Sequence, residues 1–108
     1  MKEIKAFIRP ELLEDVLGPL YAHPEFPGVT ISAVHGFGHT VGRQGTSDFG
    51  QVPMMKLEAI VPDALLDEVL TLIRERACTG RGGDGKIAVY DVQSAIRIST
   101  GEAIEESG

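Results

Sequence analysis

The residues best suited to chemistry gather in one short segment, residues 79–86, which reads TGRGGDGK. Its four glycines let the backbone turn tightly and direct successive N–H groups at one anion. Arg81 and Lys86, together with Arg97, can neutralise phosphate charge. This spacing fits a phosphate-binding loop, and it fits equally well a glycine-rich turn that ends at a surface lysine.

The segment matches the known nucleotide-binding motifs only in part. Residues 80–86 match the start of a P-loop, G-x-x-x-x-G-K, but Ile87 stands where a serine or threonine would hold magnesium. The same residues also spell the dinucleotide fingerprint G-x-G-x-x-G. Both motifs run from a strand into a helix, whereas this segment runs from a predicted helix into a predicted strand. We therefore predict neither a P-loop nor a Rossmann site.

Other reactive residue types give weaker indications. His35 and His39 are four residues apart, and four residues of extended strand span ~13 Å, too far to chelate one ion. We predict no metal site and interpret these histidines as surface residues. Cys78 has no evident partner base and is predicted to be buried in a helix. The carboxylates of the predicted helices repeat on solvent faces, so we expect no catalytic pair and no enzyme activity.

Charge and length narrow the class of protein. The chain has 108 residues and a net charge of -6, which argues against a general nucleic-acid binder and against binding to anionic membranes. Its length fits one domain, residues 1–108, and a domain this small gains from further burial in an oligomer. A single cysteine, no apolar leader and no apolar run of ~18 residues are typical of a cytoplasmic protein.

Six elements must position the glycine-rich segment. Period-two alternation and β-rich stretches predict four strands, over residues 4–8, 29–35, 55–61 and 87–92. Apolar stripes of helical spacing follow Pro10 and Pro62. The glycine-rich residues 38–53 form a connection long enough to be functional, and we interpret them as an effector loop. The acidic residues 101–108 are predicted to form a flexible tail.

The predicted order β-α-β-β-α-β contains an internal repeat. LLEDVL at residues 12–17 recurs as LLDEVL at residues 65–70, and each copy follows a strand. Two similar halves favour an α+β ferredoxin-like sandwich, with two helices on one face of an antiparallel four-stranded sheet. The other face also carries apolar residues and must be covered, which favours oligomerisation.

The whole sequence resembles the P-II nitrogen-regulatory signal proteins. Matching stretches are MKEIKAFIRP, VHGFG and KLEAIVPD, and the most specific are TG, GDGKI, AIRI and TGE at residues 79–80, 83–87, 95–98 and 100–102. The resemblance implies a homotrimer of ferredoxin-like subunits with ADP, AMP or ATP bound in clefts between them. It also implies an exposed loop that docks on an enzyme or a membrane transporter.

The same resemblance implies roles for individual residues. The phosphate-binding residues it implies are Gly80, Arg81, Gly83, Asp84, Gly85, Lys86 and Arg97. Phe7, Thr30 and Ile60 are implied to lie near the adenine, with Gly38 also in the nucleotide site. The effector-loop residues it implies are His39, Thr40, Arg43, Gln44 and Asp48.

The sequence departs from the family pattern at three informative positions. Ser99 replaces a second phosphate-binding arginine, and Thr40 and Met54 replace the glutamine and lysine that help to bind 2-oxoglutarate with Mg-ATP. The loop is also about five residues shorter and has no tyrosine for uridylylation. We therefore expect a divergent P-II-like branch. We expect ADP or AMP to bind at least as well as ATP, without a 2-oxoglutarate response unless Arg43 and Gln44 supply the lost groups.

Three functions remain open. The first is a non-catalytic nucleotide sensor that regulates a partner protein. The second is a trimer responsive to a small anion such as bicarbonate, or to a metal, and linked to inorganic carbon uptake or metal transport. The third is a structural trimer with an inactive cleft. The intact GDGK at residues 83–86, together with Arg97, favours the first over the third, while the histidines and methionines near the loop keep the second open.

Overall fold

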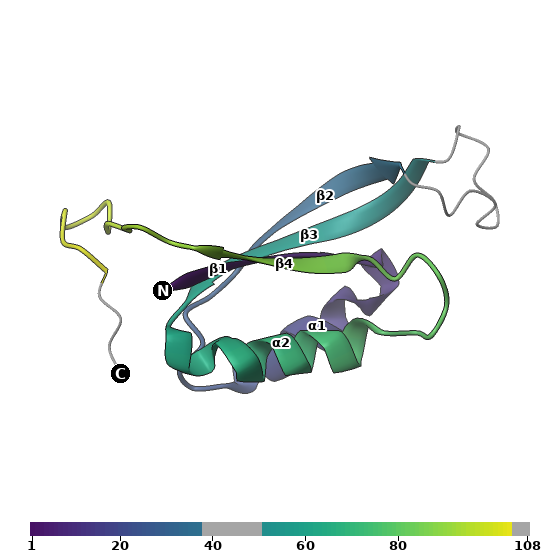
Figure 1. Cartoon of the computed structure of the whole chain (residues 1–108), viewed down its shortest axis with the longest axis horizontal. Helices are drawn as coiled ribbons and strands as arrows, with labels where there is room; N and C mark the ends of the chain where they lie inside the picture. The colour runs from purple at the N-terminus through teal and green to yellow at the C-terminus, as the bar shows by residue number, and fades with distance from the viewer. Residues whose placement is uncertain (38–50, 105–108) are drawn as a thin grey trace.

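The computed structural model describes residues 1–37 and 51–104 and confirms the predicted ferredoxin-like arrangement. The elements are β1 (Lys2–Ile8), η1 (Pro10–Leu12), α1 (Leu13–Ala22), β2 (Thr30–Phe37), β3 (Gln51–Val61), α2 (Asp63–Ala77) and β4 (Lys86–Asp91). The strands form one sheet in the order β2-β3-β1-β4, with every neighbouring pair antiparallel. Both helices cover the same face of this sheet (Figure 1).

The core lies between this sheet face and the helices. Ile4, Ala6 and Ile8 of β1 are at most 1% exposed, as period-two alternation requires of residues that share one face. Val16 and Val69 occupy equivalent positions in the sequence repeat, and both are buried in the same cluster. Each such aliphatic side chain contributes roughly 1.5–3 kcal/mol on burial. The sequence repeat therefore places residues at equivalent positions of the two helices in the same core.

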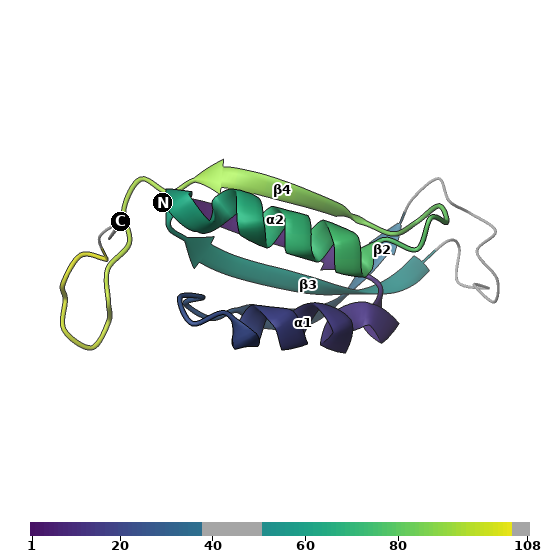
Figure 2. The ribbon, with the colours of Figure 1, turned by 90° about the horizontal axis from the view of Figure 1, so that it is seen from below.

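The two ends of the sheet carry different segments. Residues 78–85 connect α2 to β4 at one end, which we call the loop end, and β2 finishes and β3 begins near it (Figure 1). The N-terminus and residues 92–104 lie at the opposite end, which we call the terminal end (Figures 1 and 2). Strand β1 runs from the terminal end to the loop end, and β4 returns antiparallel to it.

The structure bears on two predicted boundaries. The predicted loop 38–53 is too long, because residues 51–53 already pair with β2 as the start of β3. Residues 101–104, predicted to belong to a flexible tail, make backbone contacts: Ala103 bridges Ile96, and the Gly101 N–H donates to the Arg97 carbonyl at 2.8 Å. A glycine at φ +74 permits this tight reversal. Residues 38–50 and 105–108 lie outside the described part of the chain.

The sheet face away from the helices, which we call the open face, carries a mixture of charged and apolar residues. Lys5 lies 5.3 Å from the centre of the Tyr90 ring and 3.9 Å from the Glu58 carboxylate. Ile60 and Tyr90 are exposed on this face of the single chain. Their exposure fits the expectation that a further surface covers the open face.

Candidate functional site

The glycine-rich loop begins where α2 stops. Cys78 adopts an extended conformation (φ -86°, ψ 123°) and ends the helix. Gly80, Gly83 and Gly85 then have φ values of +82°, +85° and +105°. Side-chain-bearing residues rarely adopt this conformation, so the loop path requires glycine at these three positions. The predicted tight turning of the backbone is therefore present.

Asp84 organises the loop from within. Its carboxylate accepts hydrogen bonds from the Thr79 N–H at 2.8 Å, the Thr79 hydroxyl and the Gly80 N–H at 3.3 Å. The Thr79 hydrogen bond and the adjacent Arg9 guanidinium hold the pKa of Asp84 well below its usual range, against the opposing effect of burial. Asp84 is predicted to line the phosphates, and in this structure its carboxylate bonds Thr79, Gly80 and Arg9, so that it shapes the loop backbone.

Arg9 is the partner of Asp84 and was missed by the sequence analysis. Its Nε donates to Asp84 Oδ1 at 2.8 Å, and its Nη2 donates to the Gly82 carbonyl at 2.9 Å. The side chain is only 4% exposed. No local pattern in the sequence marks it, because Arg9 simply ends a predicted strand and precedes Pro10.

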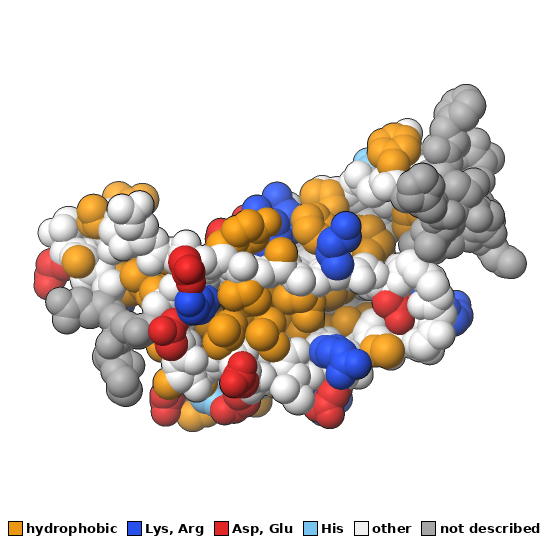
Figure 3. Space-filling view, viewed as in Figure 1, with side chains coloured by type: hydrophobic (Ala, Val, Ile, Leu, Met, Phe, Trp, Pro, Cys, Tyr) orange, Lys and Arg blue, Asp and Glu red, His pale blue; other side chains and the backbone are white. Residues whose placement is uncertain are grey.

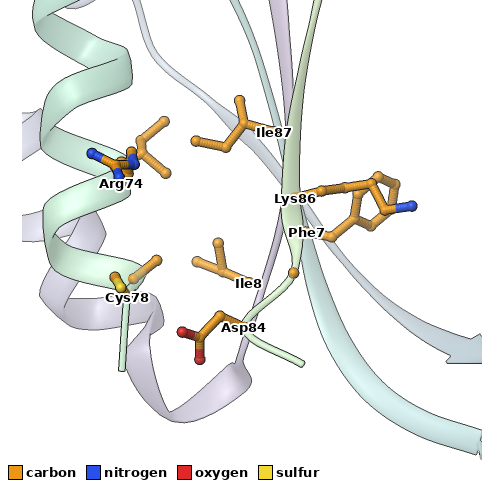
Figure 4. Close-up of a pocket in the computed structure, with 10 residues that line it drawn as sticks. Phe7, Ile8, Arg74, Cys78, Asp84, Lys86 and Ile87 are labelled. Atoms are coloured by element: carbon orange, nitrogen blue, oxygen red, sulfur yellow. The ribbon is translucent and has the colours of Figure 1, made fainter. Parts of the chain in front are cut away.

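Lys86 and Phe7 lie side by side on the open face at the loop end. Lys86 begins β4 and pairs with Phe7, which also pairs with Lys56 on β3. Paired residues of neighbouring strands share one face, and Figure 4 shows Lys86 and Phe7 pointing away from α2. Lys56 was also missed, although its phase in the alternation of β3 could have identified it. Two lysines that flank Phe7 in the sheet, with the Lys56 ammonium 3.6 Å from the Glu58 carboxylate, suit a ligand with a base and phosphates.

The remaining predicted adenine contacts share the open face but lie farther from the loop end. Thr30 lies on strand β2, where it pairs with Glu58 of β3, and β2 is the edge of the sheet opposite to the edge strand β4 that carries Lys86. Ile60 pairs with Glu3, nearer the terminal end. A single chain therefore brings Phe7 and Lys86 together but does not bring Thr30 or Ile60 beside them.

Arg97 lies at the other end of the molecule from the loop. Strand β4 carries the chain from Lys86 to Asp91, about 17 Å at 3.3 Å per residue. Residues 92–104 then continue from that terminal end (Figures 1 and 2). The predicted meeting of Arg97 with Lys86 therefore does not occur within one chain. The predicted site residues Gly38, His39, Thr40, Arg43, Gln44 and Asp48 all lie outside the described residues.

A pocket of about 330 Å³ lies beneath the loop on the helix side of β4. Its walls include Ile8, Ile73 and Ile87, and Figure 3 shows apolar side chains gathered between β4 and α2. The prediction that Cys78 is buried in a helix is wrong, because α2 ends at Ala77 and leaves the thiol exposed. Phe7 and Lys86 also line this pocket, although the Lys86 side chain points to the other side of β4 (Figure 4).

Two further properties concern only the described residues. No group of three or more histidine, cysteine, aspartate or glutamate side chains in residues 1–37 and 51–104 is arranged to hold a metal ion. Among the same residues, no helix has the length and apolar character needed to cross a membrane.

Sequence comparisons with known proteins identify the family of this chain. A sequence model of the family "Nitrogen regulatory protein P-II" matches residues 1–102. Proteins of that name from Haemophilus influenzae and Pasteurella multocida are 46% and 42% identical to this chain, over 99% of each chain. "Nitrogen regulatory protein P-II 1" of Escherichia coli is 43% identical over 94% of this chain and 95% of its own length. The chain therefore belongs to the P-II family of nitrogen regulatory proteins.

Proposed function

We propose that this protein is a non-catalytic signal-transduction protein that binds an adenine nucleotide between the subunits of a homotrimer. In this proposal the bound nucleotide controls how residues 38–50 dock on a partner enzyme or transporter. The observation that carries the proposal is the glycine-rich loop, which three glycines at positive φ turn tightly beside Lys86, Phe7 and Lys56. Family membership supports a regulatory role in nitrogen metabolism.

The charges around the loop favour a phosphate ligand. Asp84 is balanced inside the loop by Arg9, so its negative charge is offset where a phosphate would approach. Lys86 and Arg81 are exposed; Arg81 lies within the loop and Lys86 directly follows it. A hydrogen bond from a charged donor to phosphate contributes about 1.5–3 kcal/mol.

The position of Arg97 supports a site between subunits. Because Arg97 lies at the terminal end of its own chain, only a second copy can bring an Arg97 to the loop end of the first. The apolar neighbours of Arg97, Ile96 and Ile98, are exposed in the single chain. Together with Ile60 and Tyr90 on the open face, they form apolar surface suited to contact with other copies.

The direct test is calorimetric titration of ATP, ADP and AMP into the wild type, Lys86→Ala and Arg97→Ala. Each substitution should weaken binding about 10- to 100-fold, the loss of one charged hydrogen bond. Arg76→Ala is the matched control, because Arg76 is exposed near the end of α2 and outside the proposed site. Unchanged nucleotide affinity in both site variants would show that the loop is only a structural turn. Titrations with bicarbonate address the alternative of a small-anion sensor.

Mixed trimers test whether the site lies between subunits. When Lys86→Ala and Arg97→Ala chains are refolded together, a Lys86 from one chain can meet an Arg97 from its neighbour. About a quarter of the sites should then regain wild-type affinity in an equal mixture. If Lys86 and Arg97 act within one chain, no mixture restores binding, and the proposed position of the site is wrong.

A further inference from the structure

Arg9 is unusual among the described residues because it is the only charged side chain that is buried, at 4% exposure. Burying a charge is unfavourable unless it is paired and hydrogen-bonded. Arg9 meets this condition through the glycine-rich loop, with Asp84 and the Gly82 carbonyl as its acceptors. A side chain 75 residues away in the sequence from Asp84 therefore holds this loop through two hydrogen bonds.

The geometry of Arg9 links the two halves of the loop. One guanidinium edge holds Gly82 and Asp84, near the point where the loop returns to β4. Asp84 in turn holds Thr79 and the Gly80 N–H, where the loop leaves α2. A planar guanidinium can serve two acceptors in fixed directions, whereas a lysine ammonium is a single point charge on a flexible stem.

The loop also touches the end of β1 at a second place. Gly85 packs against the backbone carbonyl of Phe7, two residues before Arg9 in the chain. The end of β1 therefore sets both the position of Lys86, through Phe7, and the path of the loop, through Arg9. Glycine-rich segments lose more conformational entropy than others when they are ordered, so such fixed contacts matter most here.

We infer that Arg9 is a positioning residue that tunes the affinity of the loop for nucleotide phosphates without contacting the nucleotide. The inference rests on the proposed nucleotide-binding function. Without the guanidinium, the Asp84 carboxylate would remain uncompensated among the amides that are to face the phosphate. The loop would also lose the contact that orders Gly82. Both effects act on the phosphate half of the ligand and leave the adenine contacts on the open face in place.

The test compares ligands that differ only in the number of phosphates. Adenosine, AMP, ADP and ATP are titrated by calorimetry into the wild type, Arg9→Met, Arg9→Lys and the surface control Arg76→Met. In Arg9→Met, we expect ADP and ATP affinity to fall about tenfold or more, as for the loss of one charged hydrogen bond. AMP should lose less, and adenosine should be unchanged. Arg9→Lys should recover part of the loss, and Arg76→Met should behave as the wild type.

The dependence on phosphate number distinguishes positioning from a general structural role. Equal weakening of all four ligands, or wild-type affinity for ADP and ATP in Arg9→Met, would overturn the inference. If Arg9→Met does not fold, Thr79→Val removes the hydroxyl that holds Asp84 from the other side, and it should show the same graded loss. A wild type that binds none of the four ligands would overturn the proposed function itself, whereas a failure confined to the Arg9 variants overturns only this inference.

Discussion

The backbone of Gly85 lies directly against the carbonyl oxygen of Phe7: a Cβ at position 85 would be 1.8 Å from that oxygen. The two nearest atoms belong to the backbone of Phe7, so no side-chain rotation relieves the overlap. The φ of +105° is a second reason why only glycine fits. This contact joins the last residue of the loop to the end of β1 and thereby sets where Lys86 begins β4.

We expect Gly85→Ala to lower the free energy of unfolding by about 3 kcal/mol, from overpacking and backbone strain together. Nucleotide affinity should fall with it, because Lys86 is the next residue. Gly28→Ala is the matched control, since Gly28 has a φ of +118° but open space around it, and should lose only about 1 kcal/mol. Urea denaturation measures both. Equal losses in the two variants would mean that the contact with Phe7 is unimportant.

The Asp84 carboxylate should make stability fall at acid pH. Its pKa lies below the usual value of 3.8, first because of Thr79 and then because of Arg9. As pH falls, the unfolded chain therefore takes up this proton before the folded protein, which favours unfolding. The stabilising contribution is complete above about pH 5 and is lost progressively below pH 3.8.

Asp84→Asn isolates this contribution. At neutral pH the variant should be less stable by about 2–4 kcal/mol, because Arg9 stays buried without a carboxylate partner. Urea denaturation from neutral to acid pH should show the two proteins converging below about pH 4. A difference that stays constant over this range would show that Asp84 has no depressed pKa.

We expect the wild type to be a trimer that depends on the open face. Light scattering should give about three times the subunit mass of 11.6 kDa. Ile60→Glu and Tyr90→Glu should each shift the population toward monomers, because a carboxylate would be buried between subunits. Tyr21→Glu is the control, since Tyr21 is also exposed but lies on α1, on the helix side. A wild-type monomer at micromolar concentration would contradict the site between subunits.

We expect nucleotide binding without a response to 2-oxoglutarate. Met54 is buried on the open face, and its terminal methyl lies 3.1 Å from the Cβ position of Gly85. An apolar side chain thus occupies the place beside the loop where an ammonium would attract a dicarboxylate. In the proposed complex, Ser99 supplies no cation to the terminal phosphate, so we expect ADP or AMP to bind at least as well as ATP.

The measurement is an ATP titration at constant magnesium, with and without millimolar 2-oxoglutarate, beside titrations of ADP and AMP. Unchanged ATP affinity is the expected result. A tenfold gain, about 1.4 kcal/mol of coupling, would contradict the prediction and would indicate that the segment 38–50 supplies new ligand groups.

The sequence by itself determined the features that depend on near neighbours along the chain. Period-two alternation placed Ile4, Ala6 and Ile8 on one sheet face, and the repeated apolar stripe placed Val16 and Val69 in one core. The glycines of residues 80–85 marked a loop that needs positive φ. Such patterns are legible because side-chain direction and backbone freedom are set within a few residues.

Only the tertiary structure decided which distant residues meet. The buried pair of Arg9 and Asp84 depends on β1 and the loop reaching the same end of the sheet, and Arg97 is kept away from Lys86 because β4 carries the chain to the other end. Cys78 is exposed because α2 stops one residue before it. Strand register and chain reversals arise from packing over the whole domain, so no local pattern in the sequence reports them.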